Sequence, residues 1–239
     1  MGRMVYAREA EKDFAHYGPW SRRGRSLQRF IGKGQFRSTV SKRWLADRRR
    51  DPYYRKAKQL DYRSRASFKL IQIDDKFHLL RPGAVVTDLG AAPGGWLQVA
   101  AERVGPKGKV VGVDLQPIEP IEGVITIQGD MRKDDTVTDV LEVLGGKVDV
   151  VLSDMSPNIS GSYSMDHARS VDLCEHAFEF AERVLRKNGS LVMKIFEGDM
   201  MQDFLRLVKA RFTDVRLYGP DASRSSSSEI YIVAKGFTG

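Results

Sequence analysis

The fold of this chain is decided by one stretch of sequence, Val85-Val86-Thr87-Asp88-Leu89-Gly90-Ala91-Ala92-Pro93-Gly94-Gly95-Trp96. Its first part is a short, mostly apolar run that predicts a buried strand. The following loop is rich in glycine, which lets a backbone turn sharply and approach a ligand closely. The residues from Gly95 onward suit a helix. The stretch therefore predicts a strand, a ligand-binding turn and a helix in succession.

The glycine-rich loop also excludes two kinds of site. It lacks the Lys-Ser/Thr pair of a nucleoside-triphosphate-binding loop, and its glycines do not have the G-x-G-x-x-G spacing of dinucleotide-binding folds. Pro93 makes the loop rigid and removes a backbone donor, which does not suit a pyrophosphate cradle. Taken alone, such a loop is a weak signal and is more often a structural turn than a ligand site.

On both sides of this stretch, predicted helices and strands alternate. The helices are Arg65–Lys76, Gly95–Val104, Asp134–Leu144, Asp166–Lys187 and Met200–Arg211. The strands are Ala84–Leu89, Lys109–Leu115, Val124–Gln128, Val148–Ser153, Leu191–Phe196, Val215–Tyr218 and Ile230–Ala234. This alternation predicts an α/β fold with a mainly parallel sheet and helices on both faces. Ligands of such sheets bind at the carboxyl ends of the strands.

The clearest helix is 166–187, whose apolar residues recur with helical spacing and which Gly189 is placed to end. Cys174 lies on its apolar stripe, so we expect a core thiol. As the only cysteine, it also excludes an intramolecular disulfide and a multi-cysteine zinc site. We expect no metal site.

Bulk composition limits the cellular setting. The chain has 239 residues, of which 41% are hydrophobic, enough for a sizeable core. It has no apolar run near the roughly 20 residues that span a bilayer, and no signal-peptide core at its start. Glu9, Glu11 and Asp13 disfavour a mitochondrial presequence. We therefore expect a cytoplasmic protein without membrane contact.

Charge is distributed unevenly along the chain. Residues 1–65 hold 19 Lys+Arg against 6 Asp+Glu, whereas the remainder holds 20 against 25. A basic segment attracts phosphates, and the aromatic rings interleaved with its charges can stack on unpaired bases. A solvated tail is the alternative interpretation. We predict a basic, RNA-binding extension over residues 1–50 and a catalytic domain over 51–239.

Two aspartates strengthen the prediction of a ligand site. Asp114 ends the strand after the glycine-rich loop, where a carboxylate can accept both hydroxyls of an adenosine ribose. Asp130 follows the next strand, where it could accept from an adenine amino group. Together they predict a nucleoside pocket. Because NAD would use Asp114 equally well, an NAD-dependent oxidoreductase remains the alternative from another class.

Charged residues also mark the ends of later strands. Ser153-Asp154-Met155-Ser156-Pro157-Asn158 lacks the aromatic that amine-methylating enzymes carry after proline, and no cysteine is placed for methylation of pyrimidine C5. If the chain is a methyltransferase, an oxygen atom therefore remains as the expected methyl acceptor. Lys194 interrupts an apolar run and Glu229 precedes another, which is costly in a buried strand unless the charge is paired or functional. Each could also be a strand-end charge that reaches solvent.

Five ordered motifs resemble the FtsJ/RrmJ family of 2′-O-ribose RNA methyltransferases over roughly residues 52–236. They are Arg63-Ser64-Arg65-Ala66-Ser67-Phe68-Lys69-Leu70, Asp88–Trp96, Ser153-Asp154-Met155-Ser156-Pro157-Asn158-Ile159-Ser160-Gly161, Lys194-Ile195-Phe196-Glu197-Gly198 and Ser228-Glu229-Ile230-Tyr231-Ile232-Val233-Ala234. The resemblance implies a Rossmann-like, S-adenosylmethionine-dependent fold of seven strands, the last one antiparallel.

The resemblance also implies roles for single residues. The family's catalytic tetrad falls on Lys69, Asp154, Lys194 and Glu229, called the tetrad below. Cofactor contacts fall on Gly90, Gly94, Trp96, Asp114, Asp130 and Asp154.

Lys194 is our candidate to orient the ribose hydroxyl and take its proton. Burial would lower the pKa of a lysine while neighbouring carboxylates would raise it, so its charge at the moment of attack stays open. Arg224, in a serine-rich loop before Glu229, is a candidate phosphate contact.

The expected substrate is a uridine in large-subunit (23S-type) ribosomal RNA, within the subunit or its precursor, and we expect a monomeric enzyme. Methylation of tRNA or another RNA is the alternative within this class. An RNA-binding protein with a degenerate pocket is a further alternative, which the complete tetrad disfavours. The basic residues 1–50 precede the first motif and leave the identity of the RNA open.

Overall fold

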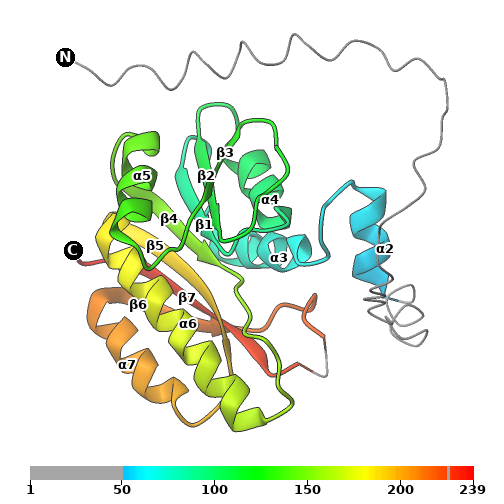
Figure 1. Ribbon diagram of the computed structural model, residues 1–239, viewed down its shortest axis with the longest axis vertical. Coiled ribbons are helices and arrows are strands. Elements are labelled where there is room, and N and C mark those ends of the chain that lie inside the picture. The colour runs from blue at the N-terminus through cyan, green and yellow to red at the C-terminus, as the bar shows by residue number, and fades with distance from the viewer. Residues whose placement is uncertain (1–50, 225–226) are drawn as a thin grey trace, which may run out of the picture. The chain divides into compact units, whose positions relative to one another are not determined.

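A computed structural model describes residues 51–224 and 227–239, and its centre is a seven-stranded sheet (Figure 1). The strands are β1 Val85–Leu89, β2 Lys109–Asp114, β3 Val124–Gln128, β4 Val148–Ser153, β5 Leu185–Phe196, β6 Phe212–Tyr218 and β7 Glu229–Phe237. Their order across the sheet is β3-β2-β1-β4-β5-β7-β6, and only β7 runs in the opposite direction to the other strands. The predicted, mainly parallel α/β sheet with an antiparallel last strand is confirmed.

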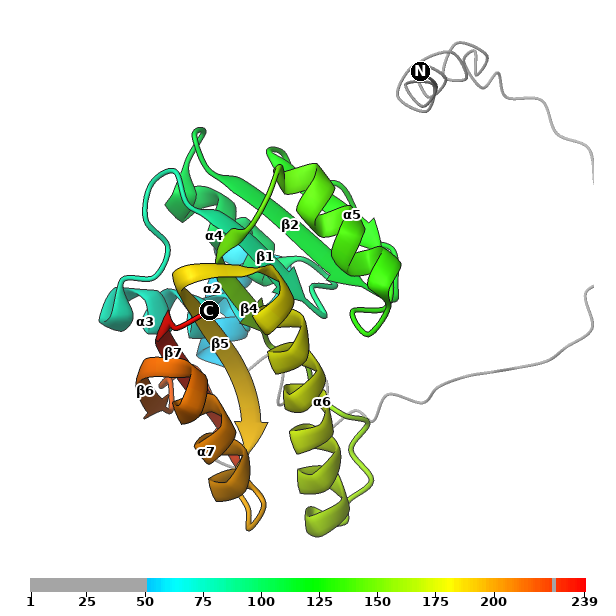
Figure 2. The same cartoon turned by 90° about the vertical axis from the view of Figure 1, so that its left-hand side faces the viewer.

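Helices cover both faces of this sheet (Figure 2). They are α2 Pro52–Gln59, α3 Ser67–Phe77, α4 Gly95–Val104, α5 Asp134–Leu144, α6 Tyr163–Val184 and α7 Met201–Arg211. Helices α3 and α4 pack in one apolar core with one face of the sheet, and α5, α6 and α7 pack in a second core on the other face. The central strands are apolar on both sides because both sides are buried. In the described part of the chain, no helix is both long and apolar enough to cross a membrane.

The order of the strands locates the functional edge of the sheet. The chain winds outward from β1 through β2 to β3 and then returns to β4 on the other side of β1. A crevice forms outside the carboxyl ends of the two strands at such a reversal. The loops after Leu89 and Ser153 therefore begin at the place where a ligand of this fold binds.

The predicted helix 166–187 is wrong at both ends. Helix α6 begins three residues earlier, at Tyr163, and stops at Val184. Leu185 has an extended backbone and pairs with Val148 of β4, so the segment up to Gly189 belongs to β5. An apolar residue such as Leu185 suits both a buried helix and a buried strand. Helical periodicity alone therefore cannot distinguish the last turn of a helix from the start of a strand whose partner is distant in the sequence.

Helix α2 was not predicted. It is only eight residues long, too short for a clear apolar period, but it has a strong start signal. The Asp51 carboxylate accepts hydrogen bonds from the amides of Tyr53 and Tyr54, and Pro52 occupies the first helical position. Ala57 packs with Phe68 and Ala222 in a small apolar cluster, which ties α2 to α3.

Candidate active site

The glycine-rich loop is shaped by two residues with a left-handed backbone. Gly90 has φ 68°, and a Cβ there would lie 2.2 Å from Cγ of Met155. Gly94 has φ 105°, caps α4, and would place a Cβ 2.7 Å from Cδ1 of Ile121. Both positions therefore require glycine, because a side chain would be strained as well as blocked. The turn brings the backbone of β1 against the loop that follows β4.

A cavity opens beside this turn, at the carboxyl ends of β1 and β2, and we call it the nucleoside cavity. Its walls are Gly90, Val113, Asp114, Leu115, Gly129, Asp130, Met131, Arg132, Met155, Asp172, Leu173 and His176. Asp114 receives one backbone amide on each carboxylate oxygen, from Ala92 and Gln116. Each oxygen keeps a free lone pair, so the side chain is held in place and can still accept hydroxyl donors.

Asp130 lies on the same cavity but is already engaged. Its two oxygens accept from the backbone and the guanidinium of Arg132, which also lines the cavity. The hydrogen bonds from Arg132 lower the pKa of Asp130 to about 2. The structure thus brings both predicted aspartates to one cavity, with more free acceptor capacity on Asp114.

Trp96 and Gly94 lie elsewhere. Neither belongs to the residues that line the nucleoside cavity. Trp96 is buried, its indole N–H donates to the carbonyl of Ala66 at 2.8 Å, and its ring packs 5.9 Å from that of Tyr231. In this structure Trp96 joins the start of α3 to the sheet.

The pairing of β5 with β7 brings the charged residues of these two strands together. Lys194 is opposite Tyr231, and Phe196 is opposite Glu229. Directly paired residues point to the same face of a sheet, as do residues two apart along a strand. All four therefore lie on the face covered by α3, which contributes Lys69. Because β7 runs antiparallel, its first residue lies beside the carboxyl end of β5.

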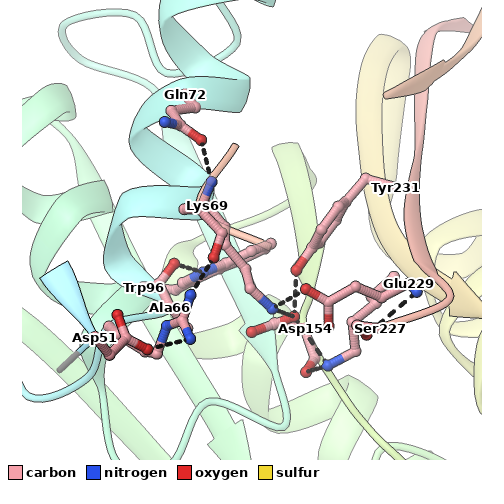
Figure 3. A network of polar contacts seen from close by, with 12 residues as sticks. Asp51, Ala66, Lys69, Gln72, Trp96, Asp154, Ser227, Glu229 and Tyr231 are labelled. Atoms are coloured by element: carbon pink, nitrogen blue, oxygen red, sulfur yellow. Dashed lines mark hydrogen bonds and ion pairs between the residues drawn. The ribbon is translucent and has the colours of Figure 1, made fainter. Parts of the chain in front are cut away.

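The tetrad forms one connected cluster at this edge, and Figure 3 labels three of its members, Lys69, Asp154 and Glu229. Nζ of Lys69 lies 2.6 Å from Glu229 and 4.0 Å from Oδ1 of Asp154. Nζ of Lys194 lies 3.0 Å from the same oxygen and donates to the carbonyl of Asp154 at 2.8 Å. Figure 3 shows Lys69, Glu229 and Tyr231 converging on Asp154. The four predicted residues are thus neighbours in space, although they span 160 positions of the sequence.

Electrostatics within the cluster keep the carboxylate of Glu229 charged. Burial acts to raise the pKa of Glu229, but the ammonium of Lys69, helped by Ser223 and Lys194, outweighs it and holds that pKa below its ordinary value. Both lysine side chains are mostly buried. Taking a charge out of water is unfavourable unless an opposite charge compensates, and each lysine here has such a partner.

Tyr231 belongs to this cluster and was missed at the level of sequence. Its hydroxyl donates to Oδ1 of Asp154 at 2.6 Å, and the side chain is fully buried. Burial, together with the charges of Asp154 and Glu229, raises the pKa of Tyr231 well above its ordinary value, so the phenol keeps its proton. A tyrosine in an apolar strand resembles a core residue, and only its position opposite Lys194 would have marked it.

A second cavity, the tetrad cavity, lies in front of this cluster. It is lined by Arg65, Ala66, Lys69, Ser156, Ile159, Phe196, Arg224, Ser227 and Glu229. The guanidinium of Arg65 pairs with Asp51 and donates to the carbonyl of Ala222, which fastens the loop that carries Arg224. Three cations around one carboxylate suit an anionic polymer such as a phosphate backbone.

The two cavities fit the two partners that the sequence predicts. Apolar walls with an oriented carboxylate suit the adenosine part of S-adenosylmethionine, for which Asp114 would hold the ribose. Asp154 lies in the loop after β4, which also supplies Met155 to the nucleoside cavity and Ser156 to the tetrad cavity. The cofactor's methyl end and a sugar hydroxyl could therefore meet near Asp154.

The structural prediction for Cys174 is confirmed. The thiol is buried on the inner face of α6, where it donates to the carbonyl of Lys194. Burial raises the pKa of Cys174 to about 12, which leaves it unreactive as a thiolate at neutral pH.

The chain is similar to known proteins in both sequence and structure. The family model described as FtsJ-like methyltransferase matches residues 62–237. The ribosomal RNA large subunit methyltransferase E of Methanothrix thermoacetophila is 54% identical over 191 residues, covering 80% of this chain and 74% of that protein. The protein of the same name from Methanocaldococcus jannaschii is 50% identical over 203 residues, covering 83% of each. A crystal structure from Plasmodium falciparum, assigned as a ribosomal RNA methyltransferase, has a TM-score of 0.67 at 31% identity and covers 74% of this chain and 100% of its own.

Proposed function

This chain belongs to the FtsJ-like methyltransferase family, and from that premise we propose that it methylates a ribose 2′-hydroxyl of large-subunit ribosomal RNA with S-adenosylmethionine. One observation carries the proposal. Lys69, Asp154, Lys194 and Glu229 form a single ion-pair cluster. Lys69 and Glu229 line the basic tetrad cavity, and Asp154 directly precedes Met155, which borders the nucleoside cavity.

The main task of the protein in this reaction is to align the two reacting atoms. S-adenosylmethionine supplies a methyl group that its sulfonium already makes electrophilic. The protein must bring a sugar oxygen into line with that methyl, and well-oriented reactants gain much of their rate from this positioning. Asp154 and Tyr231 fix the position of Lys194, whose remaining hydrogen can be donated to the incoming hydroxyl.

Lys194 then has two tasks. By donating to the 2′-oxygen, its ammonium leaves an oxygen lone pair free to attack and stabilises negative charge that develops there. The hydroxyl proton must leave during or after attack. Lys194 can pass one of its own protons to the carboxylate of Asp154, 3.0 Å away, and then accept the hydroxyl proton on the lone pair that this frees. Lys69 and Glu229 line the tetrad cavity and position the ribose.

Substitution of Lys194 tests this assignment. We expect Lys194→Ala to lose at least about a hundredfold in methyl transfer, the lower end of what a positioned proton-transfer group contributes. Binding of S-adenosylmethionine, measured by calorimetry, should stay within a few-fold of wild type. Lys209→Ala, on the exposed side of α7, is the matched control. Undiminished transfer by the Lys194 variant would remove the residue from the mechanism.

The target RNA is identified by a separate experiment. Mapping of 2′-O-methyl sites in total RNA with and without the gene should show one lost site in large-subunit ribosomal RNA. A lost site in tRNA would favour the alternative substrate, and loss of a base methyl would overturn the assignment to ribose.

A further inference from the structure

A third cavity lies beside the tetrad cavity and has no role in the mechanism above. We call it the α6 cavity, because Tyr163 and Asp166 of α6 form one wall. Ile159, Phe196 and Ser227 line both this cavity and the tetrad cavity, so the two are adjoining hollows of one surface. Figure 2 shows the starting end of α6 and the final end of β5 at the same end of the molecule.

The linings of the two adjoining cavities differ in chemistry. The tetrad cavity presents Arg65, Lys69 and Arg224. The residues of the described chain that line the α6 cavity include no lysine or arginine; they are aromatic, aliphatic and hydroxyl-bearing, with one carboxylate. A phosphate would be held in the first cavity and not in the second. The α6 cavity, at about 280 Å³, lies near the lower end of the roughly 300–1,000 Å³ range of small-molecule sites and suits one planar ring.

Its carboxylate is engaged by hydrogen bonds within the protein. Asp166 accepts hydrogen bonds from the amide and the hydroxyl of Ser160 and from the amide of Gly161. These bonds lower the pKa of Asp166, the amide of Ser160 contributing most. Asp166 therefore serves to fix the loop that carries Ile159.

Tyr163 is a fixed and exposed ring at this cavity. It is 61% exposed, and Ile159 on the same cavity is 64% exposed. The tyrosine hydroxyl donates to the carbonyl of Glu197, which anchors the far end of the ring to the segment after β5. An aromatic ring that is held at its edge and open on its face is suited to stacking, and nucleobases stack on such rings without strong preference for one base.

We propose that the α6 cavity binds a nucleobase of the substrate RNA, stacked on Tyr163, while the tetrad cavity holds the sugar–phosphate of the target nucleotide. This inference rests on the proposed function. The base can belong to the target nucleotide or to an immediate neighbour, since both are attached to the backbone that enters the tetrad cavity.

The test combines variants of Tyr163 with RNAs that lack one base. The probe is a synthetic RNA spanning the mapped methylation site, either intact or with an abasic ribonucleotide at the target, the 5′ neighbour or the 3′ neighbour. KM for RNA and kcat are measured at saturating S-adenosylmethionine for wild type, Tyr163→Ala, Tyr163→Phe and the control Leu207→Ala, an exposed apolar residue on α7.

We expect Tyr163→Ala to raise KM for intact RNA roughly 5- to 150-fold, the range for loss of one stacked base, with a smaller change in kcat. Tyr163→Phe keeps the ring and should stay within a few-fold of wild type. One abasic RNA should raise KM for the wild type similarly and should cancel the effect of Tyr163→Ala. The position of that abasic site identifies the nucleotide.

Two results would overturn the base site. The effect of Tyr163→Ala could be independent of every abasic position, or Tyr163→Phe could be as impaired as Tyr163→Ala, which would mean that the hydroxyl only supports Glu197. Either result leaves methylation by the wild type intact and so leaves the proposed function standing. Failure of the wild type to methylate any RNA would overturn both.

Discussion

At the scale of single residues, the site is organised around Asp154. One of its oxygens accepts from Tyr231 and pairs with Lys194, and its main-chain carbonyl accepts from Lys194 as well. An anion that collects several donors loses much of its freedom to rotate, so it sets the position of each donor in turn. Lys194 is therefore held by both the carboxylate and the main-chain carbonyl of Asp154.

The two aspartates of the nucleoside cavity should differ in their importance. Asp114 keeps free lone pairs, whereas Asp130 is engaged by Arg132. A hydrogen bond to a charged group contributes about 1.5–3 kcal/mol, so we expect Asp114→Ala to weaken binding of S-adenosylmethionine roughly 10- to 150-fold. Asp130→Ala should have a smaller effect. Calorimetric titration of both variants checks this order, and an equal or reversed order would contradict it.

Asp88 provides a prediction on stability. It is buried in β1, and burial, with the negative charges of Asp154 and Asp114, raises its pKa well above the ordinary value. A group with a raised folded-state pKa contributes full stability below its unfolded pKa and loses that contribution as the pH rises toward the folded value. Each pKa unit between the two states amounts to about 1.4 kcal/mol.

Asp88→Asn cannot ionise and should escape this loss. The measured quantity is the free energy of unfolding in urea, without ligand, for the variant and for the wild type. We expect the value of the variant minus that of the wild type to increase from pH 4 to pH 8. A difference that does not change with pH would show that Asp88 titrates alike in folded and unfolded chains.

At the scale of elements, α6 holds the segment from the end of β5 to the start of α7. Nδ1 of the buried His167 lies 3.0 Å from the carbonyl of Phe196, and Nε2 accepts from the amide of Met200. An acceptor at Nε2 requires the hydrogen of a neutral ring to be on Nδ1. Ser170 accepts from the amide of Phe196, so both polar groups of that residue's backbone are fixed by α6.

His167→Leu tests this role of α6. The variant keeps a buried side chain but removes the His167 partner of the Phe196 carbonyl, and an unsatisfied buried group costs about 1–3 kcal/mol. The amide of Met200 keeps its hydrogen bond to the Asp199 carboxylate. We expect a lower free energy of unfolding in urea and weaker methyl transfer, because Phe196 borders the tetrad cavity. Wild-type stability in this variant would show that the two hydrogen bonds do not hold the segment.

At the scale of the whole molecule, the prediction assigns catalysis to the domain over residues 51–239 and RNA binding to the basic residues 1–50. Residues 1–50 lie outside the described residues, so their predicted RNA-binding role remains a proposal. Asp51, the first described residue, caps α2 and pairs with Arg65 of the tetrad cavity. The first described residue is thereby joined by an ion pair to the wall of the tetrad cavity.

Removal of residues 1–50 should weaken RNA binding and also make it less sensitive to salt. Each phosphate that a protein neutralises steepens the dependence of affinity on salt concentration. We expect the slope of log affinity against log salt to become shallower in the shortened chain, while binding of S-adenosylmethionine is unchanged. An unaltered slope would mean that these basic residues do not contact the RNA backbone.

The sequence by itself determined the class of fold and most element boundaries, and it singled out four charged residues that lie together in the structure. Strands 124–128 and 148–153 and helices 95–104 and 134–144 have the predicted bounds, because apolar period, glycine turns and strand length are local properties. The family prediction and the use of S-adenosylmethionine are confirmed by relatives at about half identity. Lys194 was recognisable because a charge inside an apolar strand is costly without a purpose.

Only the tertiary structure decided how these residues meet. The pairing of β7 with β5 places Tyr231 opposite Lys194 and Glu229 opposite Phe196, a register that no local pattern contains. The pairing of β5 with β4, which is also non-local, makes Leu185 a strand residue and not a helical one. Strand partners are chosen by contacts between distant segments, so periodicity can predict that a strand exists but not which side chains it brings together.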